Sequence, residues 1–226
     1  MNPNEGILLI DKPTGITSHD VVDVVRKKLS VKRVGHTGTL DPLATGLLIV
    51  LVGRQYTKKQ EQYLKQDKQY QVTVKLGIET DSYDSEGSVV KKALPALLKK
   101  VTLKNIKESL KNFQGEITQT VPAYSAIKIK GKKLYELARQ NKKIKLPQRI
   151  VNIKGLKLIS FNSKTSQLEL LVDCSSGTYI RSLAHDLGQS LGVGAHVTIL
   201  RRTKIGDLSV TKAIPLEKVY KTTKKE

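Results

Sequence analysis

Apolar residues recur along the chain with the spacing of strands and helices, and the clearest signal is strict alternation. Residues 70–76 alternate between apolar and polar side chains, which is the pattern of a strand with one buried face. Residues 167–174 alternate in the same way, so we expect Cys174 to be a small buried residue and not a nucleophile. The unbroken apolar run at 47–52 predicts a fully buried strand. Further strands are expected at residues 6–10, 197–200 and 205–210.

Three segments have the apolar spacing of amphipathic helices. They begin near Thr17 or Ser18, near Thr102 and near Thr178. In the first, Asp20 is placed for a capping box with Thr17. The apolar faces are formed by Val21, Val22, Val25 and Leu29, by Leu103, Ile106, Leu110 and Phe113, and by Ile180, Leu183, Ala184 and Leu187. The polar segment 57–65 predicts a short surface helix.

Length and charge narrow the class of protein. For 226 residues, one globular domain with a sizeable core is the default. Forty Lys and Arg against 20 Asp and Glu give a net charge of +20, which predicts a polyanionic partner, either nucleic acid or an acidic membrane. No apolar stretch reaches about 18 residues, which excludes a membrane-spanning helix, and no signal peptide is visible. The one cysteine cannot form an internal disulfide, which fits a cytoplasmic location.

Several kinds of site are disfavoured by the sequence. Two Phe, eight Tyr and no Trp supply little of the aromatic platform on which open sheets stack single-stranded bases. A Walker-type phosphate loop, zinc-ligand spacing and a Rossmann fingerprint are all missing. Residues 81–87 resemble a calcium loop superficially, but the acidic spacing is wrong and the last ligand is missing, so we interpret them as a solvated turn.

A basic segment follows at residues 126–154. Its ten cationic residues against one acid, Glu136, leave a local charge of 10 − 1 = +9. Such a run is often a solvated face or a flexible loop, but this density favours contact with phosphates. The ten are Lys128, Lys130, Lys132, Lys133, Arg139, Lys142, Lys143, Lys145, Arg149 and Lys154.

The stretch GHTGTLDPLATG at residues 35–46 is the strongest candidate for chemistry. It holds three glycines, one proline and one carboxylate, Asp41, between a helical segment and a buried strand. Such a loop can bring main chain close to a ligand, and Pro42 biases Asp41 toward an extended backbone. The alternative is a turn in which the glycines only bend the chain.

This stretch resembles the catalytic loop of the TruB family, the tRNA pseudouridine-55 synthases. Further blocks match the family in the same order and cover nearly the whole chain. They are GILLIDKP at 6–13, YSAIK at 124–128, GKKLYE at 131–136, CSSGTYIR at 174–181, GAHV at 194–197 and LRR at 200–202. The resemblance implies an α+β pseudouridine-synthase fold, with a mixed, mostly antiparallel central sheet flanked by helices and loops and a catalytic cleft across it. The alternating strands fit such a sheet.

The resemblance also implies the activity, which is the isomerisation of the T-loop uridine at position 55 of tRNA after base flipping. A C–N glycosidic bond is exchanged for a C–C bond, with no cofactor and no metal. Asp41 would be the catalytic carboxylate, acting either by addition to the base or through a glycal intermediate. Tyr70 would stack on the base and take part in removing the C5 proton, and Arg181 would pair with Asp41 and keep it ionised.

The remaining site residues are implied in the same way. His36 would fill the gap left by the flipped base, Tyr179 and Leu200 would line the uracil pocket, and Lys12 would buttress the site. The basic segment, at about 124–150, corresponds to a mobile thumb that closes over the RNA. Its substrate-binding lysines would be Lys128, Lys130, Lys132 and Lys133. The expected partner is the T stem-loop of tRNA, without a membrane or metal, and the expected state is a monomer.

Two other functions compete with this one. A non-catalytic RNA-binding or tRNA-folding protein would explain the charge, but it has no need of a loop carboxylate, which repels phosphate. The catalytic subunit of a guide-RNA particle is disfavoured because related subunits usually continue into a C-terminal RNA-binding domain. This chain ends about sixteen residues after its last expected strand, so we expect a single catalytic domain over 1–226 without a C-terminal PUA-like domain.

Overall fold

The computed structural model describes residues 4–125, 127–129, 131–140 and 145–220. Contacts divide the chain into two units, with Met1–Gln71 and Leu200–Glu226 in unit 1 and Val72–Ile199 in unit 2. The strands β4 (Lys68–Leu76) and β12 (Ala195–Ile205) each contribute one part to unit 1 and one part to unit 2. The single catalytic domain expected from the sequence stays a prediction.

Unit 1 is built around the strand β3 (Thr45–Val52), in which every residue after Thr45 is buried. β1 (Gly6–Lys12) and β2 (Val34–Thr37) both pair with β3 in the antiparallel sense. β12 pairs with it in the parallel sense, and β14 (Ile214–Pro215) lies parallel to β1. The order of strands in this unit is β14-β1-β3-β12-β4. The fully buried strand predicted at 47–52 is therefore confirmed.

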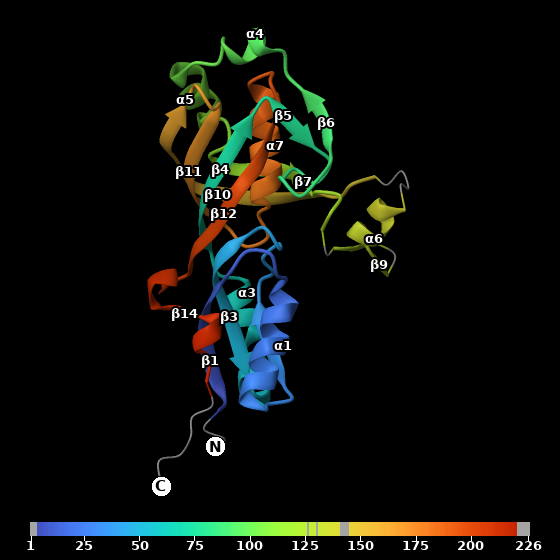
Figure 1. The fold of residues 1–226 in the computed structure, drawn as a ribbon, viewed down its shortest axis with the longest axis vertical. Helices are drawn as coiled ribbons and strands as arrows, with labels where there is room; N and C mark the ends of the chain where they lie inside the picture. Colours follow the sequence, from blue (N-terminus) through green and yellow to red (C-terminus); the bar gives the residue numbers. More distant parts are fainter. Residues whose placement is uncertain (1–3, 126, 130, 141–144, 221–226) are drawn as a thin grey trace. The chain divides into compact units, whose positions relative to one another are not determined.

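Helices cover both faces of this part of the sheet. α1 (Ser18–Leu29) packs on one face, as Figure 1 shows in blue. Thr17 caps it through the predicted capping box with Asp20. On the other face, Tyr56 of α2 (Arg54–Thr57) and Tyr63 of α3 (Gln60–Leu64) pack against the core. One helix was predicted at 57–65. The structure has two, and they separate where the Thr57 hydroxyl bonds back to the Arg54 carbonyl (3.2 Å), a contact that competes with helix continuation.

Unit 2 has the strand order β12-β4-β11-β10-β7. β10 (Gln148–Asn162) pairs antiparallel with both β11 (Gln167–Cys174) and β7 (Gly115–Thr120). The alternation predicted for β4 and β11 is confirmed, and Cys174 is buried. α7 (Ile180–Ser190) packs against β7 and α5 (Leu103–Lys111), and Thr102 caps α5. The remaining elements before β7 are β5 (Ile78–Thr80), β6 (Val89–Lys92) and α4 (Pro95–Leu98).

Two strand predictions need correction. The fifteen-residue β10 was missed because its pairing with β11 shifts register at Ile153/Gly155 and again at Leu158/Ser160, and such bulges reset the alternation of faces. The two late strands predicted at 197–200 and 205–210 are one strand, β12, followed by β13 (Leu208–Ser209), which folds back antiparallel on it. The pattern was misread because Arg202, in the middle of β12, is buried.

The chain is therefore an α+β protein whose sheet is mixed and mostly antiparallel, as expected. Short elements complete it. They are β8 (Lys128–Ile129), β9 (Lys132–Lys133) and α6 (Leu134–Arg139) between β7 and β10, and the 3-10 helices Val210–Lys212 and Leu216–Lys218 near the end. Within the described ranges, no helix has both the length and the apolar character needed to cross a membrane.

Ser18, the first residue of α1, fixes the loop that leads from β2 to β3. It is 1% exposed, and its hydroxyl accepts from the Leu40 amide (2.8 Å) and donates to the Leu40 carbonyl (3.1 Å). Leu40 is itself buried, with 3% of its surface exposed. The Ser18 hydroxyl alone therefore satisfies both the amide and the carbonyl of a buried residue. The start of a helix thereby positions the residue just before Asp41.

Replacing Ser18 by alanine tests this contact. Ser18→Ala leaves the buried amide and carbonyl of Leu40 without their partner, so we expect the free energy of unfolding to fall by about 1–3 kcal/mol. Urea denaturation measures this change. The exposed Ser163→Ala is the control and is expected to stay within about 0.5 kcal/mol of wild type. Equal stability of the two variants would contradict the role given to Ser18.

Candidate active site

The loop that carries Asp41 is tied to the segment between β1 and α1, within unit 1. The amide of Gly15 donates to the carbonyl of Pro42 (2.9 Å), and the hydroxyl of Thr14 donates to the carbonyl of Leu43 (3.1 Å). With the Ser18 contact, these bonds hold the main chain on both sides of Asp41. Its side chain lies half-buried on this loop, so the carboxylate is carried by a main chain that is held on both sides by hydrogen bonds.

Lys12, expected to buttress the site, is fully buried. Its ammonium donates to the carbonyls of Ile16 (2.6 Å), Pro13 (2.8 Å) and Pro42 (3.3 Å). A buried cation is tolerable only with such compensation. Lys12 therefore joins the end of β1 to the Asp41 loop, which fits a supporting role. Its contact with substrate stays a prediction.

Arg202 is a second buried cation of the loop, and sequence reasoning gave it no role. It is 1% exposed, and it donates from Nε to the Leu47 carbonyl (2.8 Å) and from Nη2 to the Gly38 carbonyl (3.0 Å). Gly46 lies so close that a Cβ there would sit 2.3 Å from the Arg202 carbonyl oxygen, and its φ is +99°. The glycine permits this close approach of β3 to β12. In the sequence, Arg202 stands between the two strands predicted at 197–200 and 205–210, and no local pattern there indicates that it is buried.

His36 lies on β2, immediately before the loop. Its carbonyl accepts from the side-chain amide of Gln60 (2.9 Å). Its ring nitrogen Nδ1 is buried and makes no hydrogen bond to the described residues. Burial lowers the pKa of His36, and the charges of Arg202 and His19 lower it further. The imidazole is therefore held neutral, which suits a ring that contacts a base. That contact stays a prediction.

Tyr70 and Leu200 are both buried in unit 1, with exposed fractions of 9% and 5%. Tyr70 lies on the apolar face of β4, as the alternation predicted. The hydroxyl of Thr45, at the start of β3, donates to the Leu200 carbonyl (3.4 Å). Both side chains are therefore held in place by the packing of unit 1. The roles expected for both residues stay predictions.

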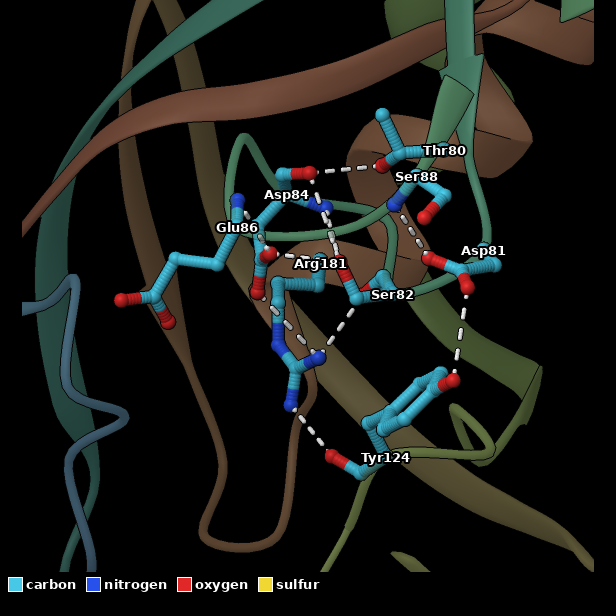
Figure 2. A network of polar contacts seen from close by, with 8 residues as sticks. All are labelled: Thr80, Asp81, Ser82, Asp84, Glu86, Ser88, Tyr124 and Arg181. Atoms are coloured by element: carbon cyan, nitrogen blue, oxygen red, sulfur yellow. Dashed lines mark hydrogen bonds and ion pairs between the residues drawn. The ribbon is translucent and has the colours of Figure 1, made fainter. Parts of the chain in front are cut away.

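Arg181, in the first turn of α7, belongs to unit 2 and is 4% exposed. Figure 2 shows its guanidinium between two segments. Nη1 donates to the Ser82 carbonyl (2.7 Å) and lies 3.4 Å from a carboxylate oxygen of Asp84, and Nη2 donates to the Tyr124 carbonyl (2.9 Å). These partners explain why a cation is found where the helix dipole disfavours it. The expected pairing of Arg181 with Asp41 stays a prediction.

Asp84 is the main residue that sequence reasoning missed. It is 2% exposed, and its other carboxylate oxygen accepts from the Ser82 hydroxyl (2.5 Å) and the Glu86 amide (3.1 Å). The interpretation of residues 81–87 as a solvated turn is therefore wrong for Ser82 and Asp84, which are buried. The cause is that the cation for Asp84 comes from a distant helix, which local sequence does not reveal.

Among the described residues, no group of His, Cys, Asp or Glu is arranged to hold a metal ion.

Tyr179 is fixed through its backbone by another buried side chain, Gln119. The amide of Tyr179 donates to the Gln119 side-chain oxygen (3.0 Å), and the Gln119 nitrogen donates back to the Tyr179 carbonyl (3.2 Å). The guanidinium of Arg149 lies 5.6 Å from the centre of the Tyr179 ring, a cation–π distance. Arg149 of the basic segment thus packs against a ring. Gln119 is fully buried, which no pattern in the sequence predicted.

Within the basic segment, the two short strands β8 and β9 pair with each other. β8 and β9 pair Lys128 with Lys133 and Ile129 with Lys132, so the backbone brings three of the four expected RNA-binding lysines together. The fourth, Lys130, lies outside the described residues, as do Lys142 and Lys143. The hairpin is anchored at Leu134, which is fully buried and whose amide donates to the Ile127 carbonyl (2.7 Å).

The buried His36 predicts a pH dependence of stability. Its pKa in the folded chain lies below the ordinary value of 6.5. Between these two values the unfolded chain binds a proton that the folded chain does not, so this stabilisation is present above pH 6.5 and is lost as the pH falls through the folded pKa. The loss is at most about 1.4 kcal/mol per pH unit.

Chemical denaturation between about pH 7.5 and about pH 5 measures how the free energy of unfolding changes as His36 becomes protonated. The curve for His36→Gln should be flatter than that of wild type by the contribution of one histidine. Ser163→Ala, a substitution without charge at an exposed site, is the control, and its curve should run parallel to that of wild type. A His36→Gln curve that kept the full wild-type slope would contradict the assignment.

Family models match residues 26–226, which hold most of this arrangement. The model described as TruB family pseudouridylate synthase (N terminal domain) matches residues 26–180. The model described as tRNA pseudouridylate synthase B C-terminal domain matches residues 181–226.

Individual proteins agree with the family models. The tRNA pseudouridine synthase B of Aquifex aeolicus is 47% identical over 213 residues, which are 94% of this chain and 72% of that protein. The enzyme of the same name from Protochlamydia amoebophila is 45% identical over 224 residues, which are 98% of this chain and 82% of that protein.

Solved structures share the fold. A Cbf5–Nop10–Gar1 complex matches with a TM-score of 0.71 and 29% identity over 96% of this chain. An H/ACA ribonucleoprotein bound to a substrate RNA matches with a TM-score of 0.69 and 27% identity over 95% of this chain. This chain spans only 54% and 52% of those solved chains. The matched family models, the sequence identity and the shared pseudouridine-synthase fold show together that the chain belongs to the TruB family of pseudouridylate synthases.

Proposed function

We propose that this chain converts one uridine in the T loop of tRNA, at position 55, to pseudouridine after flipping the nucleotide out of its stack. The observation that carries the proposal is the half-buried carboxylate of Asp41 on a loop whose backbone is tied down by buried side chains. Relatives that are 43–47% identical are named tRNA pseudouridine synthase B, which supports tRNA as the substrate.

The chemistry requires one carboxylate close to the sugar–base bond. Asp41 is proposed to start the cleavage of the C–N bond, either by adding to the base or by taking a ribose proton to give a glycal. The free base then turns and forms a C–C bond through C5. No electron is gained or lost in this exchange, so the proposed reaction needs no redox cofactor. A rigid loop supports the reaction because it holds the carboxylate in the reactive geometry before substrate arrives.

The other residues have supporting roles in the proposal. The ring of Tyr70 stacks on the flipped base, and its hydroxyl takes part in removing the proton from C5. The neutral ring of His36 occupies the space that the base leaves. Leu200 and Tyr179 line the uracil pocket. Arg181 supplies a fixed positive charge to the reaction, and Asp84 holds its guanidinium in place.

A non-catalytic RNA-binding protein remains the contrasting function. The positive charge of the chain fits both functions, but the Asp41 loop fits only the enzyme, because a carboxylate that faces RNA weakens binding. A role as the catalytic subunit of an H/ACA particle is supported by the shared fold. The higher identity to the tRNA enzymes favours the stand-alone reaction on tRNA.

Mapping of pseudouridine in a tRNA transcript by mass spectrometry tests the proposal directly. The purified chain, without added protein, guide RNA or metal, is expected to produce one pseudouridine, at position 55 of the T loop. A transcript with cytidine at that position is the control and should stay unmodified. Modification only in the presence of a guide RNA would support the particle subunit, and binding without modification would support the non-catalytic protein.

Asp41→Asn separates chemistry from binding. The variant keeps the size of the side chain and loses the carboxylate, so we expect turnover to be abolished while the affinity for tRNA stays close to wild type, because phosphate contacts carry most of it. The exposed Asp207→Asn, in the same unit, is the matched control and should keep full activity. Activity of Asp41→Asn within about tenfold of wild type would mean that transition-state stabilisation does not depend on the carboxylate.

Neutralising the β8–β9 hairpin tests its interaction with RNA. In Lys128→Gln/Lys132→Gln/Lys133→Gln, we expect weaker tRNA binding and a log–log salt slope that is lower by about 0.7 to 0.9 for each phosphate that a lysine no longer neutralises. The control Lys157→Gln/Lys164→Gln/Lys204→Gln removes the same charge from exposed sites elsewhere. If both triple variants changed the slope equally, the effect would come from net charge, and the hairpin would have no special role.

A further inference from the structure

Tyr83 lies in the middle of the tripeptide that holds Arg181. The carbonyl of Ser82, on one side, and the carboxylate of Asp84, on the other, both approach Nη1 of Arg181, at 2.7 and 3.4 Å. The proposed chemistry gives Tyr83 no role, although both of its neighbours bind the guanidinium.

The backbone of Tyr83 is left-handed, with a φ of +64°. For a residue with a Cβ, this conformation is disfavoured by a factor of about 5 to 30 relative to the right-handed one, and glycine or asparagine adopts it more readily. The conformation turns the chain so that the groups before and after Tyr83 face the same cation (Figure 2). A bulky residue at such a position indicates that its side chain contributes something that glycine would not.

The side chain of Tyr83 stacks on His185. The two ring centroids are 4.0 Å apart, and the planes differ by 17°. His185 lies four residues after Arg181 on α7, so both project from the same side of the helix. Successive turns of α7 therefore hold the tripeptide at its flanks, through Arg181, and at its centre, through His185. A ring pair favours its bound arrangement by a factor of about 2 to 12, which is comparable to what the left-handed backbone loses.

The loop has other attachments that do not involve the ring. The Val197 amide donates to the Tyr83 carbonyl (3.0 Å), and the Ser85 amide donates to the Val197 carbonyl (2.9 Å). Loss of the ring should therefore leave the loop in place and change only its local orientation. Burial raises the pKa of the Tyr83 hydroxyl, and the carboxylates of Asp186 and Glu79 raise it further. The phenol is thus uncharged near neutral pH, and Tyr83→Phe changes no charge.

We propose that Tyr83 is a positioning residue for Arg181. Its ring, stacked on His185, keeps the Ser82 carbonyl and the Asp84 carboxylate aimed at Nη1, and so fixes the orientation of the guanidinium. The inference rests on the proposed function, because it assigns Tyr83 an effect on turnover through Arg181.

Steady-state kinetics with tRNA tests the proposal. Tyr83→Ala should lower kcat by about tenfold, near the upper end of what a ring pair supplies, with KM changed less than about twofold because no RNA-binding group is removed. Tyr83→Phe keeps the stack and should restore kcat to within about twofold of wild type. His185→Ala should behave like Tyr83→Ala, and the double variant should be no slower than either single one, because the two residues act as a pair.

A matched control distinguishes positioning from general loss of stability. Phe161→Ala removes a half-buried ring from β10 in the same unit, so it should lower the melting temperature and leave kcat unchanged when assayed well below that temperature. A wild-type kcat in Tyr83→Ala, an equal loss in Phe161→Ala, or multiplicative effects in the double variant would each overturn the proposal.

A second measurement does not depend on activity. The Glu86 amide donates to the Asp84 carboxylate (3.1 Å), so its hydrogen exchange reports the orientation of that group. Exchange should be faster in Tyr83→Ala and unchanged in Tyr83→Phe, and unchanged exchange in both would overturn the proposal. A wild-type protein that is inactive on tRNA would instead overturn the proposed function, and the exchange result would still decide whether Tyr83 holds the Arg181 network in place.

Discussion

Buried cations that donate to main-chain carbonyls are the interaction on which the Asp41 loop of unit 1 and the Arg181 network of unit 2 both depend. Lys12 and Arg202 do this around the loop of Asp41, and Arg181 does it in unit 2. A loop has carbonyls that no strand or helix satisfies, and a buried cation has donors that water no longer satisfies. The carbonyls of the loop and the donors of the buried cation satisfy one another, so the irregular segment is held by hydrogen bonds that its own backbone does not provide.

This arrangement gives the charges of the chain two different functions. Within the described ranges, most Lys and Arg side chains lie outside the core, where their charge attracts a polyanion over long range. The buried cations are a small internal set whose geometry is fixed by hydrogen bonds, and they act on nearby groups only. In the proposed function, Asp41 has to approach a phosphate-rich substrate. The surface cations that attract the RNA and the buried cations that hold the Asp41 loop are different residues, so the two tasks do not interfere. The carboxylate of Asp84 is buried with these cations, because it faces Arg181 and not solvent.

Local pattern was enough to predict much of the scaffold. The capping box of α1 is formed within a few residues. The alternation in β4 and β11 and the apolar run in β3 reflect burial of apolar side chains, which does not depend on which segment covers them. The Asp41 loop was also visible, because glycine, proline and a carboxylate seldom gather between two apolar elements without a reason. β10 escaped detection because two register shifts break its alternation.

The sequence by itself determined the α+β class, the family, and the loop on which the chemistry is expected. Only the tertiary structure decided which polar residues are buried and what they bind. Arg202, Asp84 and Gln119 look like ordinary surface residues in the sequence, yet each is buried because its partners come from distant segments. A pairing of this kind is a property of the folded chain, since neither partner has a local pattern that announces the other. The left-handed turn at Tyr83 is similar, because its conformation is sustained by a ring on another element.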